Sequence, residues 1–528
     1  MAKRPMLEIK PNLYDKVVSV FSPKTALRNM QARAKVNMLS GYTGTSKTRP
    51  ALSNWDTEAA SAEVDIHTDL NINRARSRHL DRNNPIAAGT VSQTTTNVIG
   101  TGLSLEPKPD ADFLKLTEEQ AEAWVANTKR EWELFANSKD CDLERELNFY
   151  QQQDLVFRSR MISGDVCVIS PRRPRGNIYD LCLQIIEADR LNNPNRGLNT
   201  ATLVDGIRLD KDGAPVAYCF SSNHPGDLRK TNMTWQEVPA FGPNNRRNVL
   251  HLYRKLRPGQ KRGVPDFAPI IEVLKQLGTY TEAELQAAVT SGMFAMFIKM
   301  DHEAFEGLFD DAGRESYVEG AAKWEGNLDS GGRAINLLPG EEVQAPNPGR
   351  PNSEFDPFVQ SILRQVGIAL EIPYEVLIMH FQSSYSAARA ALLSAYKTYR
   401  RWRDWMSTEF CQPVYELWLE EAVAKGRVIA PGFLSNPVVR AAWCKAIWIG
   451  DGPGSIDPSK EVTAAEKRIN LGISTIESES ILHDGQDWLV KHKQRTKESR
   501  MRKEAGLNSE AVAERIATEP TIPQEPEE

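Results

Sequence analysis

Apolar residues recur along residues 355–426 at the spacing of buried helix faces. A four-residue repeat predicts a first helix from Phe355 to Leu370, and Pro373 ends it. Residues 387–425 are rich in Ala, Leu, Glu, Lys and Arg, which predicts a second, much longer helix. The apolar positions are Phe358, Ile362, Val366 and Leu370, then Leu392, Tyr396, Tyr399, Trp402, Met406, Phe410, Val414, Leu417 and Trp418.

Between these helices, residues 378–385 show no helical period and include two adjacent serines. Ser386 is the predicted N-cap of the long helix, and Pro413 predicts a kink within it. At 1.5 Å per residue this helix would be about 55–60 Å long, which exceeds the width of an ordinary domain. The unit therefore favours an elongated, assembled protein over a globular enzyme.

The other patterns predict short helices and strands around this unit. Thr117 and Gln120 have the spacing of a capping box at the start of a helix. Helices are predicted at or within residues 25–39, 58–80, 86–99, 116–136, 147–163 and 269–292. Strands are predicted at 166–169, 181–186, 207–209, 216–218, 248–255, 294–300 and 334–338. Residues 60–265 thus form a mixed helix-and-sheet domain, and residues 294–354 a small α/β insert.

Length and composition limit the classes of protein to which the chain can belong. The chain has 528 residues, 40% hydrophobic and 26% charged, and a formal net charge of −5. This length predicts about three domains, and the charge argues against a DNA-coating role but not against a channel for DNA. Six scattered cysteines indicate reduced, mostly buried thiols. The absence of a long apolar run indicates a soluble cytosolic product.

No catalytic constellation emerges from the sequence. Residues 41–48 resemble a phosphate-binding loop, but Ser46 stands where the motif needs Gly before Lys47, so a flexible loop is favoured. Ser394 and Lys397 match S-x-x-K without its partner motifs. The eight histidines form no i, i+4 pair with metal-ligand spacing. We therefore predict no catalytic residues, no cofactor and no metal.

Two stretches concentrate positive charge. The first, at the start of the long helix, consists of Arg389, Lys397, Arg400, Arg401 and Arg403, and the second runs from Lys491 to Lys503. Each is either a solvated helix face or a surface that contacts the phosphate backbone of DNA.

Several segments resemble the lambda-like branch of the phage portal protein family. The most specific is Pro373-Tyr374-Glu375 followed by residues 385–393, although Ala387 stands where a second serine is expected. The others are residues 76–78 with 82–85, 186–191, 213–218, 251–253 with 257–265, 280–285 and 456–461. Together they cover roughly residues 60–510 in one order.

The resemblance implies an α+β, mainly helical portal fold with named parts. These are an N-terminal arm, partly disordered (1–59), an α/β wing (60–265), stem helix 1 (266–293), the clip (294–354), stem helix 2 (355–372), the tunnel loop region (373–386), the long helix and rest of the wing (387–458), a helical crown (459–515) and a disordered acidic tail (516–528).

The resemblance also implies a function. Portal proteins form a ring, usually a dodecamer, at one capsid vertex, through which double-stranded DNA is packaged and ejected. The implied partners are further copies of the chain, the terminase large subunit, the head-tail adaptor, the major capsid and scaffold proteins, and DNA, with no membrane. The expected location is the virion, after synthesis in the host bacterial cytoplasm. The candidate channel residues are His380, Gln382, Ser383, Ser384, Tyr385, Arg389 and Lys397.

Two alternatives stay open at this stage. One is a nucleotide-hydrolysing enzyme that uses the imperfect loop from Gly41 to Thr48. The other is a capsid component that contacts DNA without forming the portal ring.

Overall fold

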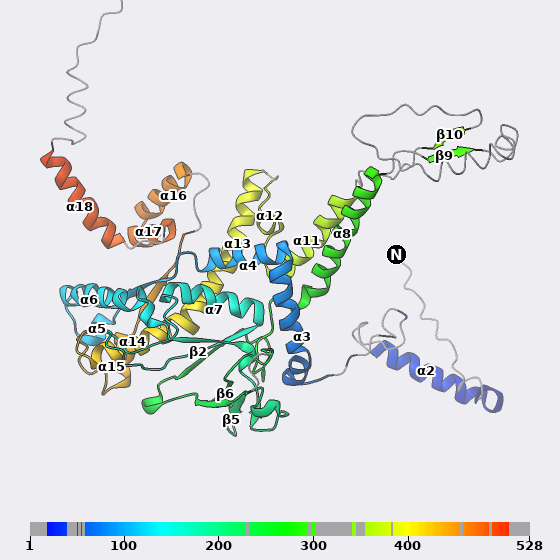
Figure 1. Ribbon diagram of the computed structural model, residues 1–528, viewed down its shortest axis with the longest axis horizontal. Helices are drawn as coiled ribbons and strands as arrows, with labels where there is room; N and C mark the ends of the chain where they lie inside the picture. Colours follow the sequence, from blue (N-terminus) through cyan, green and yellow to red (C-terminus); the bar gives the residue numbers. More distant parts are fainter. Residues whose placement is uncertain are drawn as a thin grey trace, which may run out of the picture. The chain divides into compact units, whose positions relative to one another are not determined.

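The computed structural model describes residues 18–39, 59–227, 232–293, 297–300, 341–344, 354–381, 384–452, 458–484 and 488–505, together with 50, 54 and 57. The chain divides into two compact units, residues 1–61 and residues 62–528. In the first unit the structure describes helix α2, Pro23–Leu39. All elements discussed below belong to the second unit (Figure 1).

The second unit is mainly helical. Its helices are α3 (Ala62–Asn83), α4 (Pro85–Val98), α5 (Ala111–Leu114), α6 (Glu118–Ala136), α7 (Phe149–Ser163), α8 (Ile271–Met293), α11 (Phe355–Leu370), α12 (Tyr374–Leu377), α13 (Tyr385–Met406), α14 (Gln412–Ala424), α15 (Pro437–Trp443), α16 (Pro458–Asn470), α17 (Ile476–Asp484) and α18 (Trp488–Glu504). Short 3-10 turns include η3 (Ala188–Arg190) and η6 (Ala268–Ile270).

The strands pair into small antiparallel sheets. They are β1 (Ser104–Pro107), β2 (Asp165–Ile169), β3 (Gln184–Glu187), β4 (Leu203–Val204), β5 (Ile207–Leu209), β6 (Pro215–Ser221), β7 (Trp235–Pro239), β8 (Val249–Tyr253), β9 (Phe297–Met300), β10 (Glu341–Gln344) and β11 (Ala446–Ile449). Their orders are β3-β2-β8, β4-β5-β6-β7, β1-β11 and β9-β10. The α+β, mainly helical class is confirmed.

Local chemistry explains where the helices begin. The predicted capping box of α6 is present: the Gln120 N–H donates to Thr117 Oγ1 at 3.2 Å, and the Thr117 N–H donates to Gln120 Oε1 at 3.0 Å. The break between α3 and α4 lies at Asn84, whose side chain accepts from the Ile86 and Ala87 N–H groups. Pro85 then occupies the first turn of α4, where a missing N–H costs nothing.

The long predicted helix is one continuous rod with a change of winding inside it. Between α13 and α14, residues Ser407–Cys411 form a π-helical turn, which ends two residues before Pro413. Helices can kink at such turns and at proline, and the kink predicted at Pro413 stays a prediction. The predicted apolar stripe is buried from Tyr399 to Trp418. The predicted N-cap was wrong: Ser384, not Ser386, accepts the Ala387 N–H.

Some other predicted elements begin or end at different residues in the structure, and some fall on residues that the structure does not describe. The strand predicted at 181–186 is formed only from Gln184, because residues 181–183 make isolated bridges and loop contacts instead. The hairpin of β5 and β6 is confirmed, with Gly213 at φ 79° in its turn. Residues 334–338 and the loop from Gly41 to Thr48 lie outside the described residues. The boundaries of arm, wing, stem, clip, tunnel loop, crown and tail stay predictions.

One large core holds the second unit together, and aromatic rings form its centre. Trp132 of α6 is 1% exposed and contacts Phe149 of α7 at 5.1 Å between ring centroids. It also contacts Trp418 of α14 at 5.1 Å and Trp448 of β11 at 5.8 Å. The ring therefore joins residues near 130–150 to residues more than 260 positions later. A smaller cluster packs β2, β3 and β8 against the four-stranded sheet.

All six cysteines are buried and free, as expected of reduced thiols. Among the residues that the structure describes, no helix combines the length and apolarity required to cross a bilayer.

Candidate functional site

The predicted break between the two long helices is set by the end of α11. Glu371 adopts a left-handed conformation at φ 59°, and its N–H donates to the carbonyls of Gly367 and Ile368. The chain then turns back so closely that a Cβ on Gly367 would lie 2.6 Å from the Ile372 carbonyl oxygen. The Glu371 carboxylate accepts from Arg401 of α13 at 2.6 Å. The same residue thus ends α11 and anchors α13.

Helix α12 and the residues after it form the break itself. Met379 has φ 54°, a conformation that costs a non-glycine residue about 1–2 kcal/mol. The His380 N–H donates to the Glu375 carbonyl at 3.0 Å. Met379 is 66% exposed and Phe381 is 44% exposed, so apolar side chains face outward here. Such a strained, exposed segment is typical of a functional loop.

The candidate channel residues fall into three groups. His380 is exposed, and Ser384 caps α13. Gln382 and Ser383 lie outside the described residues, and of Tyr385 only its place as the first residue of α13 is described. Arg389 and Lys397 lie on α13 itself.

The basic residues of α13 divide by their partners. Arg403 donates to the carbonyls of Val98 and Asn97, and Arg401 to Glu371, so both tie α13 to its neighbours. Arg389 lies 3.7 Å from Glu461 of α16. Lys397 and Arg400 are exposed and make no ion pair with any residue that the structure describes. At about 100° per residue, these three fall within about 80° of one helix face.

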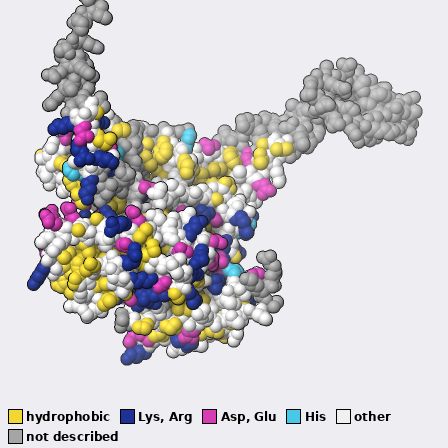
Figure 2. Space-filling view, turned by 60° about the vertical axis from the view of Figure 1, so that its left-hand side comes forward, with side chains coloured by type: hydrophobic (Ala, Val, Ile, Leu, Met, Phe, Trp, Pro, Cys, Tyr) yellow, Lys and Arg dark blue, Asp and Glu magenta, His cyan; other side chains and the backbone are white. Residues whose placement is uncertain are grey.

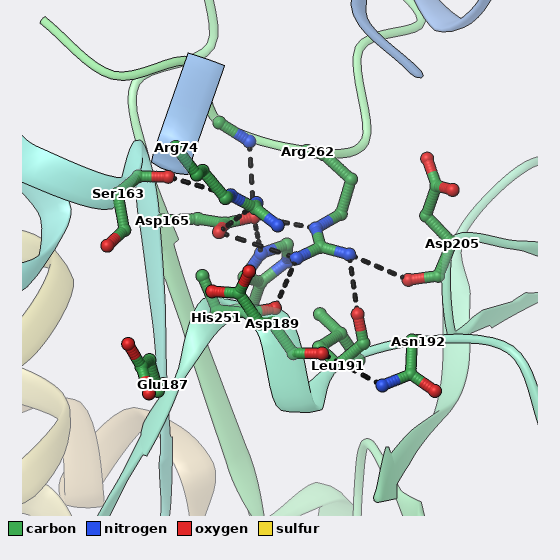
Figure 3. A network of polar contacts seen from close by, with 12 residues as sticks. Arg74, Ser163, Asp165, Glu187, Asp189, Leu191, Asn192, Asp205, His251 and Arg262 are labelled. Carbon is green, nitrogen blue, oxygen red and sulfur yellow. Dashed lines mark hydrogen bonds and ion pairs between the residues drawn. The ribbon is translucent and has the colours of Figure 1, made fainter. Parts of the chain in front are cut away.

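A second candidate centre is a buried network around Asp165, which the sequence did not reveal (Figure 3). Asp165 begins β2, and its side chain is 1% exposed. Its carboxylate accepts from Arg74 of α3 at 2.6 Å and from Arg262 Nε at 2.7 Å. His251 of β8 lies 3.1 Å away, and the Gly263 N–H donates to the same oxygen atom at 3.2 Å.

The two arginines bring one more positive charge than Asp165 balances, and backbone carbonyls take up the excess. Arg262 donates to the carbonyls of Leu191, Asp205 and Ala188 at 2.7, 2.9 and 2.7 Å. Arg74 donates to the Ser163 carbonyl at 2.9 Å, at the end of α7. Carbonyls at a helix end lack partners within the helix and carry its negative dipole end. The network therefore fixes α3, α7, β2 and the loop at 262–263 to one another.

Burial alone would raise the pKa of Asp165, but the charges of Arg262 and Arg74 hold it well below its usual range. Burial lowers the pKa of His251, against the opposing effect of Asp165. Near neutral pH the network thus contains an ionised carboxylate, two guanidinium groups and a neutral imidazole. These groups satisfy each other, and the arrangement fits a structural joint better than a reactive centre.

Beside this network, Glu187, Asp189 and His224 offer donor atoms within 4.8 Å of one another. Arg78 already pairs with both carboxylates. His224 Nδ1 accepts the Gly226 N–H at 2.9 Å, which places the proton of the neutral ring on Nε2. Because Nε2 is the atom that faces the carboxylates, it has no lone pair for a metal in this tautomer. The cluster is therefore better explained by ion pairing to Arg78.

Three comparisons place the chain among known proteins. The family model "Phage portal protein, lambda family" matches residues 48–403. The portal protein of Escherichia phage N15 is 27% identical over 484 residues, which cover 88% of this chain and 90% of that protein. Portal protein B of Escherichia phage lambda is 26% identical over 481 residues, covering 88% and 90%.

A solved structure, the virion of a native gene transfer agent particle, aligns with 72% of this chain and 98% of its own chain. The sequence identity is 12% and the TM-score 0.37. A score below 0.5 does not by itself establish a shared fold.

Proposed function

Because the chain belongs to the lambda family of phage portal proteins, we propose that its copies form a closed ring at one capsid vertex. The central channel of this ring conducts double-stranded DNA during packaging and ejection. The twelvefold symmetry usual in this family is the expected subunit number. Neither a nucleotide-hydrolysing loop at Gly41–Thr48 nor a non-portal capsid role is favoured by a feature of the described residues.

The main support for the proposed ring is the exposure of apolar residues on α8 and α11. The two helices pack through Tyr280, whose ring lies 5.6 Å from Phe355 and 5.1 Å from Phe358. Yet Leu285 and Val289 of α8 are 66% and 54% exposed, and Ile368 of α11 is 79% exposed. Leu285 and Val289 lie four residues apart on α8 and so share a face, and an exposed apolar face typically marks a contact surface. Neighbouring copies of the stem helices would cover them.

The remaining parts are assigned by the family pattern. Residues 60–265 and 387–458 supply the wing, which meets the major capsid and scaffold proteins. The clip, residues 294–354, meets the terminase large subunit and later the head-tail adaptor. Residues 459–515 supply the crown, flanked by the arm (1–59) and tail (516–528) at the chain ends. The protein acts as a passive conduit in the virion and leaves ATP hydrolysis to the motor.

Residues 373–386 and the basic face of α13 are assigned to the channel wall. Exposed Lys397 and Arg400 support this assignment, because contact with phosphates requires charge but no reading of base sequence. The chain is nevertheless negative overall, which suits a channel in which DNA slides rather than adheres.

Negative-stain microscopy of the purified protein is expected to show rings with a central pore. Replacing Leu285 and Val289 together by Glu is expected to abolish the rings, because buried charges at the contact would lack partners. The matched control is Val64→Glu, since Val64 is 58% exposed and lies in the first turn of α3 instead of on a stem helix. A stable wild-type monomer under all assembly conditions would refute the ring.

Alanine at Tyr385, Arg389 and Lys397 is expected to leave rings intact while reducing the yield of DNA-filled particles by tenfold or more, about 1.4 kcal/mol or more in the limiting step. The measurement is packaged DNA per particle in an infection or in-vitro packaging assay. Ser394→Ala serves as control, because Ser394 is exposed on the same helix and uncharged. Failed ring assembly in the triple variant would contradict the channel assignment.

A further inference from the structure

Helix α18 is the most basic element that the structure describes. Within Lys491–Lys503 it carries seven cationic residues and one carboxylate, while the whole chain is negative. Residues 492–505 are all exposed. Figure 2 shows Lys and Arg side chains crowded along α18, at the upper left of the view.

The helix has little means of anchoring this charge within the protein. Its contacts with α17 lie in its first turns, where Lys491 Nζ donates to Ser480 Oγ at 2.8 Å. The Trp488 ring stacks on His492 at 4.9 Å. Beyond this point the helix has no apolar stripe, since Met501 is itself 55% exposed. A helix that is polar all round needs charge pairs or a partner for its stability.

Six of the seven cations form two stripes on opposite sides of the helix, and Lys503 lies between the stripes. At about 100° per residue, the first stripe spans about 40° and the second about 60°, with their centres about half a turn apart. The first contains Lys491, Arg495 and Arg502, and the second contains Lys493, Lys497 and Arg500. Each stripe includes one acid: Glu498 lies in the first, and Glu504 lies 3.9 Å from Arg500 in the second.

We propose that α18 binds double-stranded DNA by lying in its major groove, with one stripe on the phosphates of each strand. The groove is about 12 Å wide and a helix with its side chains is about 10–12 Å across. Cations on opposite sides of the helix therefore reach both walls. A flat anionic surface would engage one stripe only. The contact is electrostatic and reads no sequence.

This inference rests on the proposed function only for the identity of the polyanion. The chain itself offers a competing occupant, because residues 506–528 contain six carboxylates and one arginine. The experiment must therefore separate DNA from this segment.

The test is the salt dependence of binding to a random-sequence DNA duplex, measured with the purified full-length protein. Arg495→Gln with Arg502→Gln removes two of the three cations of one stripe, and Lys493→Gln with Lys497→Gln removes two of the three cations of the other. Each lost phosphate contact is expected to lower the slope of log K against log salt by about 0.9, and affinity at 50 mM salt by about tenfold. The two pairs should lower the slope by similar amounts, and the quadruple variant should lower it by about twice that amount.

The matched control is Lys115→Gln with Lys211→Gln, which removes two exposed lysines outside α18. Each variant is also measured with Glu519, Glu525, Glu527 and Glu528 replaced by Gln, so that these carboxylates cannot mask the effect. An unchanged slope in both backgrounds overturns the proposal, and an effect of one stripe alone overturns the groove geometry. Absence of rings in the same wild-type preparation would instead count against the proposed function.

Discussion

Replacing Asp165 by Asn is expected to lower the free energy of unfolding by about 3–5 kcal/mol, because it leaves two buried arginines without their counter-charge. Arg74 and Arg262 are 2% and 3% exposed, so water cannot replace the lost carboxylate. Asn keeps the size of the side chain, so the effect reports charge and not a cavity. The measurement is chemical denaturation followed by circular dichroism.

Asp212→Asn is the control, because Asp212 is an exposed aspartate in the turn before β6. The pH dependence gives a second check. A carboxylate whose pKa is depressed on folding stabilises the protein above its unfolded pKa, near 3.9, and this stability is lost as pH falls through the lower folded value. The wild type should therefore lose this contribution in acid, and the variant should not. Equal stability of variant and wild type at neutral pH would show that the network is dispensable.

Replacing Trp132 by Ala is expected to cost about 3–5 kcal/mol, the range for deleting a buried large aromatic side chain. Its ring lies among Phe149, Trp418 and Trp448, so the deletion opens a cavity between α6, α7, α14 and β11. The substitution also removes contacts between segments that are far apart in the sequence.

Leu134→Ala on the same helix is the matched control, because Leu134 is 43% exposed and should cost much less. Tryptophan fluorescence during denaturation would follow the core directly. If the two alanine variants unfold at the same denaturant concentration, Trp132 does not occupy the centre of a tightly packed core.

The long helices were predictable because their information is local. The repeat from Phe358 to Leu370 gives the bounds of α11, and the Thr117–Gln120 pair gives the start of α6. The N-cap of α13 was misplaced by two residues because Ser384 and Ser386 have equal intrinsic capping ability. Only the backbone conformation of Ser384, at φ −56° and ψ 153°, decides between them.

The Asp165 network was not predictable, because its members are far apart in sequence. Arg74 and Asp165 are separated by 91 residues, and Asp165 and Arg262 by 97. The one usable signal was local: Arg74, Ser77 and Arg78 lie at i, i+3 and i+4 and so share a face. That face meets the end of α7, where Ser77 donates to the Ile162 carbonyl at 2.6 Å.

The candidate channel segment was likewise predictable only in its local features. The break after α11 and the basic start of α13 follow from periodicity and composition. Which cations stay available does not, because Arg401 and Arg403 are distinguished from Lys397 only by their partners in space.

The π turn at Ser407–Cys411 determines how α13 and α14 are rotated relative to each other about the helix axis. Trp402, Met406, Phe410 and Val414 follow at steps of four residues, which in a regular helix of 3.6 residues per turn would drift by about 120°. The wider turn absorbs this drift, and Met406, Phe410 and Val414 all stay fully buried. The turn thus sets the angle around the helix axis between Lys397 and Arg400 of α13 and Trp418 of α14. Deleting one residue here would rotate the cation-bearing half by about 100° and move Tyr399 and Trp402 out of the core, so the length of this turn fixes the direction in which Lys397 and Arg400 face.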